Sequence, residues 1–128
     1  MNISQVAKAT QLSSKSIRLY EEKGLISAPL RSVNGYRQYS PSHIEELLVI
    51  ARAKRVGFTL EECKALVHLA NNSETTSAEV KRRAEEKLAE VKIKLAELTV
   101  IKNQLEKWVA DCPGDSGNAC PIMDDLKS

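Results

Sequence analysis

Apolar residues recur at helical spacing along most of the chain, and glycines and prolines divide its first half into short segments. The first segment, residues 3–9, carries its apolar side chains on one face. Ser14 is the predicted N-cap of a second helix, which runs to Lys23 and is ended by Gly24. Two short helices joined by a tight turn are typical of a helix-turn-helix motif.

A different pattern follows over residues 31–39. Asn34 and Gly35 stand between residues of strand character, and Asn-Gly is the strongest short-range signal for a two-stranded hairpin. We interpret this hairpin as a wing beside the helix-turn-helix.

Two further helices are predicted before residue 71. Pro41 after Ser40 is typical of a helix start, and Gly57 ends that helix. Thr59 and Glu62 have the spacing of a capping box, which predicts another helix to about residue 70.

The longest predicted element runs from Ser77 to about Asp111, a stretch without glycine or proline. Its apolar residues follow a heptad in which only Lys102 interrupts the seam: Ala84, Leu88, Val91, Leu95, Leu98, Leu105 and Val109. A helix about 50 Å long is too extended to bury this stripe on its own front domain, which is the weaker alternative. We therefore expect a homodimer joined by a coiled coil, parallel or antiparallel.

Charge is distributed unevenly along the chain. Its net value is +2, but residues 1–58 hold nine Lys or Arg and four Glu, whereas residues 59–128 hold ten basic and thirteen acidic residues. A basic front half suits a polyanion such as nucleic acid, although an ordinary solvated surface explains the charge alone equally well. No apolar run approaches the roughly 18 residues of a membrane helix and no signal peptide is apparent, so we expect a cytoplasmic protein without a membrane partner.

Candidate contacts to double-stranded DNA lie in the second helix, the wing and the end of the next helix. Ile17 and Leu19 are expected in the core. The predicted contact residues are Lys15, Arg18, Tyr20, Arg31, Asn34, Tyr36, Arg37, Tyr39 and Arg55. A coiled-coil adaptor that never touches DNA is an alternative interpretation of the whole protein.

Two cysteines, each followed by proline, mark the other end of the chain. Cys112 is expected where the long helix stops, because Pro113 disfavours helical geometry in the residue before it. Cys120 precedes Pro121, a predicted first residue of a short helix to Leu126. The amino end of that helix favours a thiolate and lowers the pKa of the thiol.

The donor set points to a soft metal ion. Two thiolates without a third soft ligand suit two-coordinate Cu(I), with Ag(I) or Au(I) as substitutes, better than tetrahedral Zn(II). A monovalent ion leaves one negative charge, which Lys81 and the amino end of the short helix are candidates to offset. Asp115 is either an acceptor for loop amides or a solvated carboxylate, and Cys63 is interpreted as a buried apolar residue.

Three motifs resemble those of the mercury-resistance-regulator (MerR) family: Arg-Leu-Tyr-Glu-Glu-Lys-Gly-Leu at 18–25, Asn-Gly-Tyr-Arg-Gln-Tyr at 34–39 and Gly-Phe-Thr-Leu-Glu-Glu at 57–62. The terminal cysteine motifs are most similar to those of its copper-efflux regulators. The resemblance implies a dimer on an over-long promoter spacer that, on binding metal, bends and underwinds the DNA so that RNA polymerase engages both promoter elements. It also implies that Ser77 stands where divalent-metal sensors of the family carry a third cysteine.

The expected fold is mainly α. It comprises a winged helix-turn-helix DNA-binding domain at 1–70, a linker and dimerisation helix at 71–111, and a metal-binding loop with a short helix at 112–128. No arrangement of catalytic residues predicts an enzyme. The function predicted is metal-responsive activation of copper-efflux and detoxification genes; the alternative is a regulator of the same fold that senses redox state through a Cys112–Cys120 disulfide.

Overall fold

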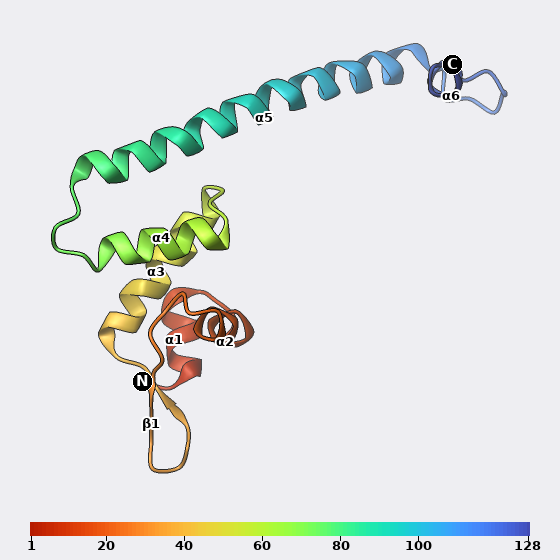
Figure 1. Ribbon diagram of the computed structural model, residues 1–128. Coiled ribbons are helices and arrows are strands. Elements are labelled where there is room, and N and C mark those ends of the chain that lie inside the picture. The colour runs from red at the N-terminus through yellow and green to blue at the C-terminus, as the bar shows by residue number, and fades with distance from the viewer. The chain divides into compact units, whose positions relative to one another are not determined.

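The computed structural model describes all residues, 1–128, and is mainly helical, as predicted. Its elements, in chain order (Figure 1), are α1 (Ile3–Thr10), α2 (Ser14–Glu22), β1 (Leu30–Arg31), β2 (Arg37–Gln38), α3 (Pro41–Arg55), α4 (Leu60–Ala70), α5 (Ser77–Asp111) and α6 (Pro121–Lys127). The chain forms two compact units, Met1–Ala84 and Glu85–Ser128. None of the helices combines the length and apolar composition needed to cross a membrane.

Side-chain caps fix where the short helices begin. Ser13, not the predicted Ser14, caps α2, because its hydroxyl accepts a hydrogen bond from the backbone N–H of Ser16 at 3.0 Å. The capping box of α4 is confirmed: Thr59 Oγ1 accepts from the N–H of Glu62 at 3.2 Å, and the Glu62 carboxylate accepts from the N–H of Thr59 at 2.8 Å.

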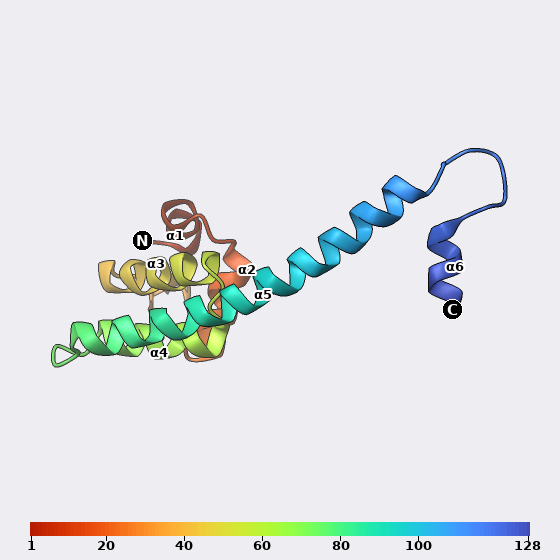
Figure 2. The same ribbon diagram turned by 90° about the horizontal axis from the view of Figure 1, so that it is seen from above.

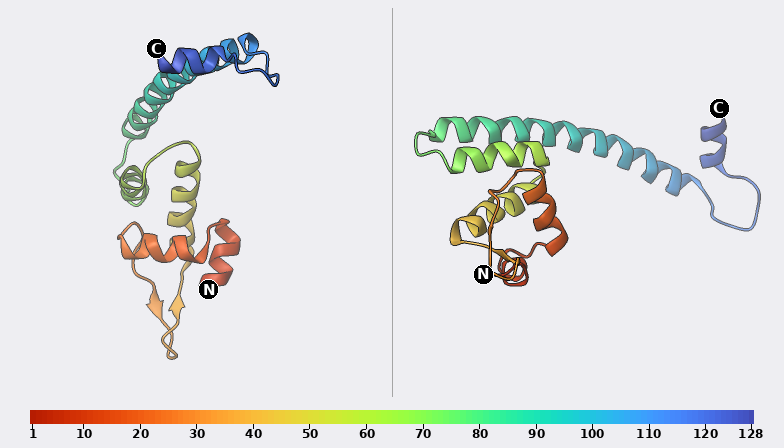
Figure 3. Two further views of the ribbon diagram at one scale, coloured as in Figure 1. Left: turned by 90° about the vertical axis from the view of Figure 1, so that its right-hand side faces the viewer. Right: turned by 60° about the horizontal axis from the view of Figure 1, so that its bottom comes forward.

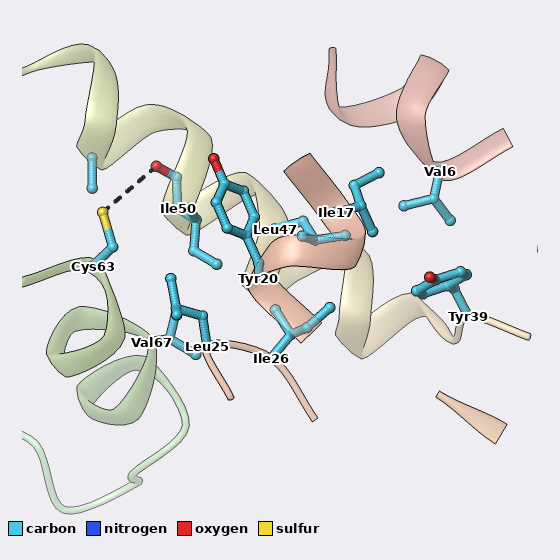
Figure 4. Packing of buried hydrophobic residues seen from close by; sticks show 11 residues of the cluster. Val6, Ile17, Tyr20, Leu25, Ile26, Tyr39, Leu47, Ile50, Cys63 and Val67 are labelled. Atoms are coloured by element: carbon cyan, nitrogen blue, oxygen red, sulfur yellow. Dashed lines mark hydrogen bonds between the residues drawn. The ribbon is translucent and has the colours of Figure 1, made fainter. Parts of the chain in front are cut away.

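The core of the first unit joins α1, α2, α3 and α4 (Figure 4). Its five largest fully buried side chains are Val6, Ile17, Leu47, Ile50 and Cys63. The thiol of Cys63 points at the carbonyl oxygen of Ile50 at 3.9 Å, which confirms its assignment as a buried residue.

The predicted hairpin is confirmed and projects from the helices of the first unit (Figure 3, left). β1 and β2 are antiparallel, with Leu30 opposite Gln38 and Arg31 opposite Arg37. Gly35 has φ +81°, a conformation that side chains with a Cβ rarely adopt, so it makes the turn possible. We call the segment Leu30–Gln38 the wing.

The second unit contains most of α5, the loop after it and α6 (Figure 2). α5 extends over 35 residues, and its heptad residues from Leu88 onward are exposed, with Leu95 and Leu98 at 58% and 59%. We call this exposed stripe, Leu88–Val109, the α5 seam. Within this chain it has no covering element, so the side chains that should pack in a coiled coil remain open to solvent.

Candidate functional site

The second helix presents a mixed surface to solvent. Lys15 and Arg18 are exposed, as a contact with DNA would require. Leu19 is exposed at 38% rather than buried in the core as expected. Tyr20 is only 5% exposed, so the prediction that it contacts DNA is wrong for its ring. Ile17 and Tyr20 are three residues apart and share the inward face of α2, which turns Leu19 outward.

Tyr39 is also part of the core, at 3% exposure, and its predicted DNA contact is likewise corrected. Its backbone N–H donates to the carbonyl of Met1 at 2.8 Å, and its hydroxyl donates to Oε2 of Glu21 at 3.4 Å. Burial, and then the negative charge of Glu21, raise the pKa of Tyr39, so the hydroxyl remains a donor.

The wing, Arg18 of α2 and the first residues of the chain, 2–4, together line a cationic groove. It is lined on its charged side by Arg18, Arg31 and Arg37, with Asn34 and Tyr36 from the wing turn. Arg31 and Arg37 stand directly opposite each other on the hairpin, and like charges in that position repel. An anion in the groove, such as a phosphate, would relieve that repulsion.

An acidic residue that the sequence reasoning missed holds one of these cations. The Nε of Arg37 donates to Oε2 of Glu21 at 2.8 Å, joining the wing to α2. The two residues are 16 positions apart, and no local spacing rule connects them. Arg31 is fixed within the wing, where its Nη1 donates to the carbonyl of Gly35 at 2.9 Å.

Arg55 is the last residue of α3 and is exposed, so it is available for contacts with phosphate. His43, near the start of the same helix, is buried, and both of its ring nitrogens have hydrogen-bond partners. Its Nδ1 accepts from the N–H of Ser40 at 2.9 Å, and its Nε2 lies 3.1 Å from the carbonyl oxygen of Ser27. It thus connects the N-cap of α3 to the loop that follows α2.

The terminal cysteines flank the loop of the second unit. Cys112 directly follows the last residue of α5, and Cys120 is the N-cap of α6 with Pro121 after it, as predicted. Both are free, half-buried thiols. The side chain of Cys120 makes no capping hydrogen bond, so the expected contact between its sulfur and helix amides is not present.

Two further side chains shape this loop. The carboxylate of Asp115 accepts from the backbone N–H of Gly117 at 2.9 Å, as the loop-acceptor interpretation predicts. The indole N–H of Trp108 donates to the carboxylate of Asp125 at 2.7 Å, which ties the end of α5 to α6. No sequence pattern predicts this pair, because 17 residues separate Trp108 from Asp125.

Ser77 and Lys81 lie in the first unit, at the first residue of α5 and one turn after it, whereas both cysteines lie in the second. Lys81 is exposed. No group of three or more His, Cys, Asp or Glu side chains stands close enough together to hold a metal ion. The thiols that flank the loop are Cys112 and Cys120.

Comparison with known proteins decides the family. Residues 1–69 match the model of the MerR helix-turn-helix family of regulatory proteins, and residues 44–108 match the model of the MerR DNA-binding region. The chain belongs to the MerR family. It is thereby a DNA-binding transcriptional regulator.

Relatives within the MerR family cover nearly the whole length of the chain. The regulator named CueR from Vibrio cholerae serotype O1 is 61% identical over 127 residues, which are 99% of this chain and 91% of that protein. CueR of Salmonella typhi is 52% identical over 126 residues, 98% of this chain and 91% of the relative. The lead(II) complex of the regulator PbrR691 from Ralstonia metallidurans CH34 has a TM-score of 0.83 at 28% identity and covers 98% of both chains.

Proposed function

We propose that this MerR-family protein is a Cu(I)-responsive activator of copper-efflux and detoxification genes, with Cys112 and Cys120 as the metal ligands. The observation that carries the proposal is the placement of two free thiols at the two ends of one loop, where α5 stops and α6 starts. Likeness to regulators named CueR supports copper as the ion.

The donor chemistry favours a monovalent soft cation. Thiolates are soft ligands, and two of them satisfy a two-coordinate ion such as Cu(I), Ag(I) or Au(I), whereas Zn(II) in proteins is almost always four-coordinate. A bound ion would join the two sulfurs and so hold the ends of the loop together. Asp115 and the Trp108–Asp125 hydrogen bond would keep the loop and α6 in place around them.

We further propose that the protein acts as a homodimer. The α5 seam is the feature that supports it, because this long row of exposed Leu and Val side chains follows a coiled-coil period. In such a dimer Ser77 and Lys81 of a second copy are the proposed neighbours of the cysteine loop, with Ser77 withholding a third thiolate and Lys81 offsetting the residual charge.

The proposed output is a change in promoter DNA. A dimer would place two wings and two copies of α2 on one duplex, and bending and underwinding of the spacer between them would let RNA polymerase engage both promoter elements. The contacts proposed for this role come from Lys15, Arg18, Arg31, Asn34, Tyr36, Arg37 and Arg55. Each is exposed, or half-buried in the case of Arg37, on the first unit.

The test is a Cu(I) titration of the protein in reducing buffer, with Cys112→Ser, Cys120→Ser and Cys63→Ser compared. Tight binding of one ion per subunit is expected for the native protein and for Cys63→Ser. The other two variants should lose metal-dependent transcription but keep promoter binding, because their thiols lie outside the DNA-binding unit.

Other outcomes would replace this proposal. Transcription that responds to oxidation and is indifferent to copper chelation would identify a thiol-disulfide switch instead. If Cys112→Ser bound Cu(I) as tightly as the native protein, the two-thiolate site would be contradicted. Loss of promoter binding in that variant would refute the separation of metal sensing from DNA contact.

A further inference from the structure

One carboxylate interrupts the cationic surface formed by α2 and the wing. Glu21 lies in the last turn of α2, and its side chain is 15% exposed. A negative charge this close to a DNA-binding face repels phosphates, so charge alone makes Glu21 unfavourable for binding.

The contacts of Glu21 give it a different role. Its Oε2 accepts from the Nε of Arg37 at 2.8 Å and from the hydroxyl of Tyr39 at 3.4 Å. Tyr39 belongs to the core and binds the carboxylate from the buried side. Arg37 belongs to the wing and binds the same oxygen. The wing is thus linked to α2 through one carboxylate.

The geometry of the guanidinium group matters for DNA. Glu21 accepts a hydrogen bond from Nε of Arg37 and not from a terminal amino group, and Arg37 is one of the residues that line the cationic groove. A guanidinium oriented in this way presents two N–H groups to a phosphate. Without Glu21, repulsion from Arg31 on the opposite strand would push Arg37 out of this position.

We propose that Glu21 is a positioning residue for DNA binding, which holds Arg37 and the wing so that the guanidinium group grips a backbone phosphate. The inference rests on the DNA binding of the first unit and adds a residue whose own charge opposes that binding. It predicts that removal of Glu21 weakens DNA binding, whereas net charge alone predicts that the loss of a negative residue strengthens it.

The experiment compares Glu21→Ala with Glu22→Ala in the full-length protein. Glu22 is the adjacent exposed residue of α2, so both changes remove one negative charge from the same turn. Binding to a mixed-sequence duplex of about 30 base pairs is measured by fluorescence anisotropy between about 50 and 200 mM salt. Such a duplex suffices because phosphate contacts do not depend on sequence.

Glu22→Ala should leave affinity unchanged or raise it. Glu21→Ala should weaken binding by about fivefold per DNA-binding head near 0.15 M salt, and lower the slope of log K against log salt by about 0.9, as expected for one lost phosphate contact. Glu21→Gln, which keeps an acceptor for Arg37, should fall between the native protein and Glu21→Ala, and thermal unfolding verifies that each variant is folded.

A double-mutant comparison tests whether Glu21 affects DNA affinity through Arg37. In an Arg37→Ala background, Glu21→Ala should cause no further loss of affinity, because the group that it positions is already gone. An equal loss in both backgrounds, or tighter binding by Glu21→Ala and Glu21→Gln, would overturn the proposal. Absence of salt-dependent binding by the native protein would instead refute DNA binding itself.

Discussion

Cys63 and Cys112 carry the same side chain in opposite surroundings. Cys63 is fully buried among apolar residues, and this burial raises the pKa of its thiol above the ordinary value of 9.0. Cys112 is half-buried beside a loop. The thiolate is the form of cysteine that binds metal, so a buried thiol with a raised pKa is a poor ligand, whereas Cys112 is accessible and is one of the two proposed ligands.

The raised pKa of Cys63 predicts a loss of stability in alkali. Because the folded state holds this proton more tightly than the unfolded state, the contribution is fully present below pH 9.0 and is lost as pH rises through the folded pKa. In a Cys112→Ser/Cys120→Ser background, further substitution Cys63→Ala should flatten the decline of the urea midpoint between pH 9.0 and 10.0.

The cost of the cavity that Cys63→Ala creates is measured separately, at neutral pH. Cys63→Ala should lower the midpoint at pH 7, where the thiol is protonated in both states, because it removes a buried sulfur. An equally steep alkaline decline with and without Cys63 would show that other groups cause it. Tyr39 is the other group with a raised pKa, and its effect should begin above 10.0.

At the scale of elements, hydrogen bonds in the first turn stabilise the helices of the first unit. α1, α2 and α4 each begin at a polar side chain that accepts a hydrogen bond from a backbone N–H three residues later. Such caps satisfy donors that have no partner within the helix.

Thr59→Ala should therefore destabilise the first unit by about 1 kcal/mol, because it removes the hydroxyl that caps α4. The measurement is urea unfolding followed by circular dichroism at one fixed protein concentration. Thr59→Ser keeps the hydroxyl and should retain most of the stability. Equal losses in the two variants would indicate that the threonine methyl group, rather than the cap, matters.

The same short-range rules explain which parts of the fold the sequence predicts. Gly24, Gly35 and the Thr59–Glu62 box are signals that span a few residues, and the helix ends and hairpin turn follow from them. Glu21 with Arg37, and Trp108 with Asp125, meet only after folding, so no local pattern announces them. The helical spacing of Ile17 and Tyr20 was a usable signal for the burial of Tyr20.

At the scale of the whole molecule, the α5 seam is a long row of apolar side chains that no other element of the chain covers. Leu95, Leu98 and Leu105 are each more than half exposed, although they share one helix face. Lys102 stands in that face and pairs with Glu106 at 3.6 Å, so it keeps its charge at the edge of the stripe. The proposed dimer would cover these side chains.

Leu98→Glu should prevent dimerisation, because it would place a carboxylate in the centre of a buried seam. Sedimentation velocity should show a monomer, and affinity for duplex DNA should fall because two heads no longer bind together. Val100→Glu is the matched control, since Val100 is exposed at 69% on the opposite side of α5. A dimer that survives Leu98→Glu would place the subunit contact elsewhere.

The hydrogen bond between Trp108 and Asp125 gives the molecule a built-in optical reporter. The chain has one tryptophan, and its indole ring bridges the last turn of α5 and the terminal helix. The first unit contains tyrosines but no tryptophan, so tryptophan emission excited selectively is expected to report how the tail is seated. Events at the cysteine loop are visible in the unlabelled protein, without a dye that would compete for the thiols.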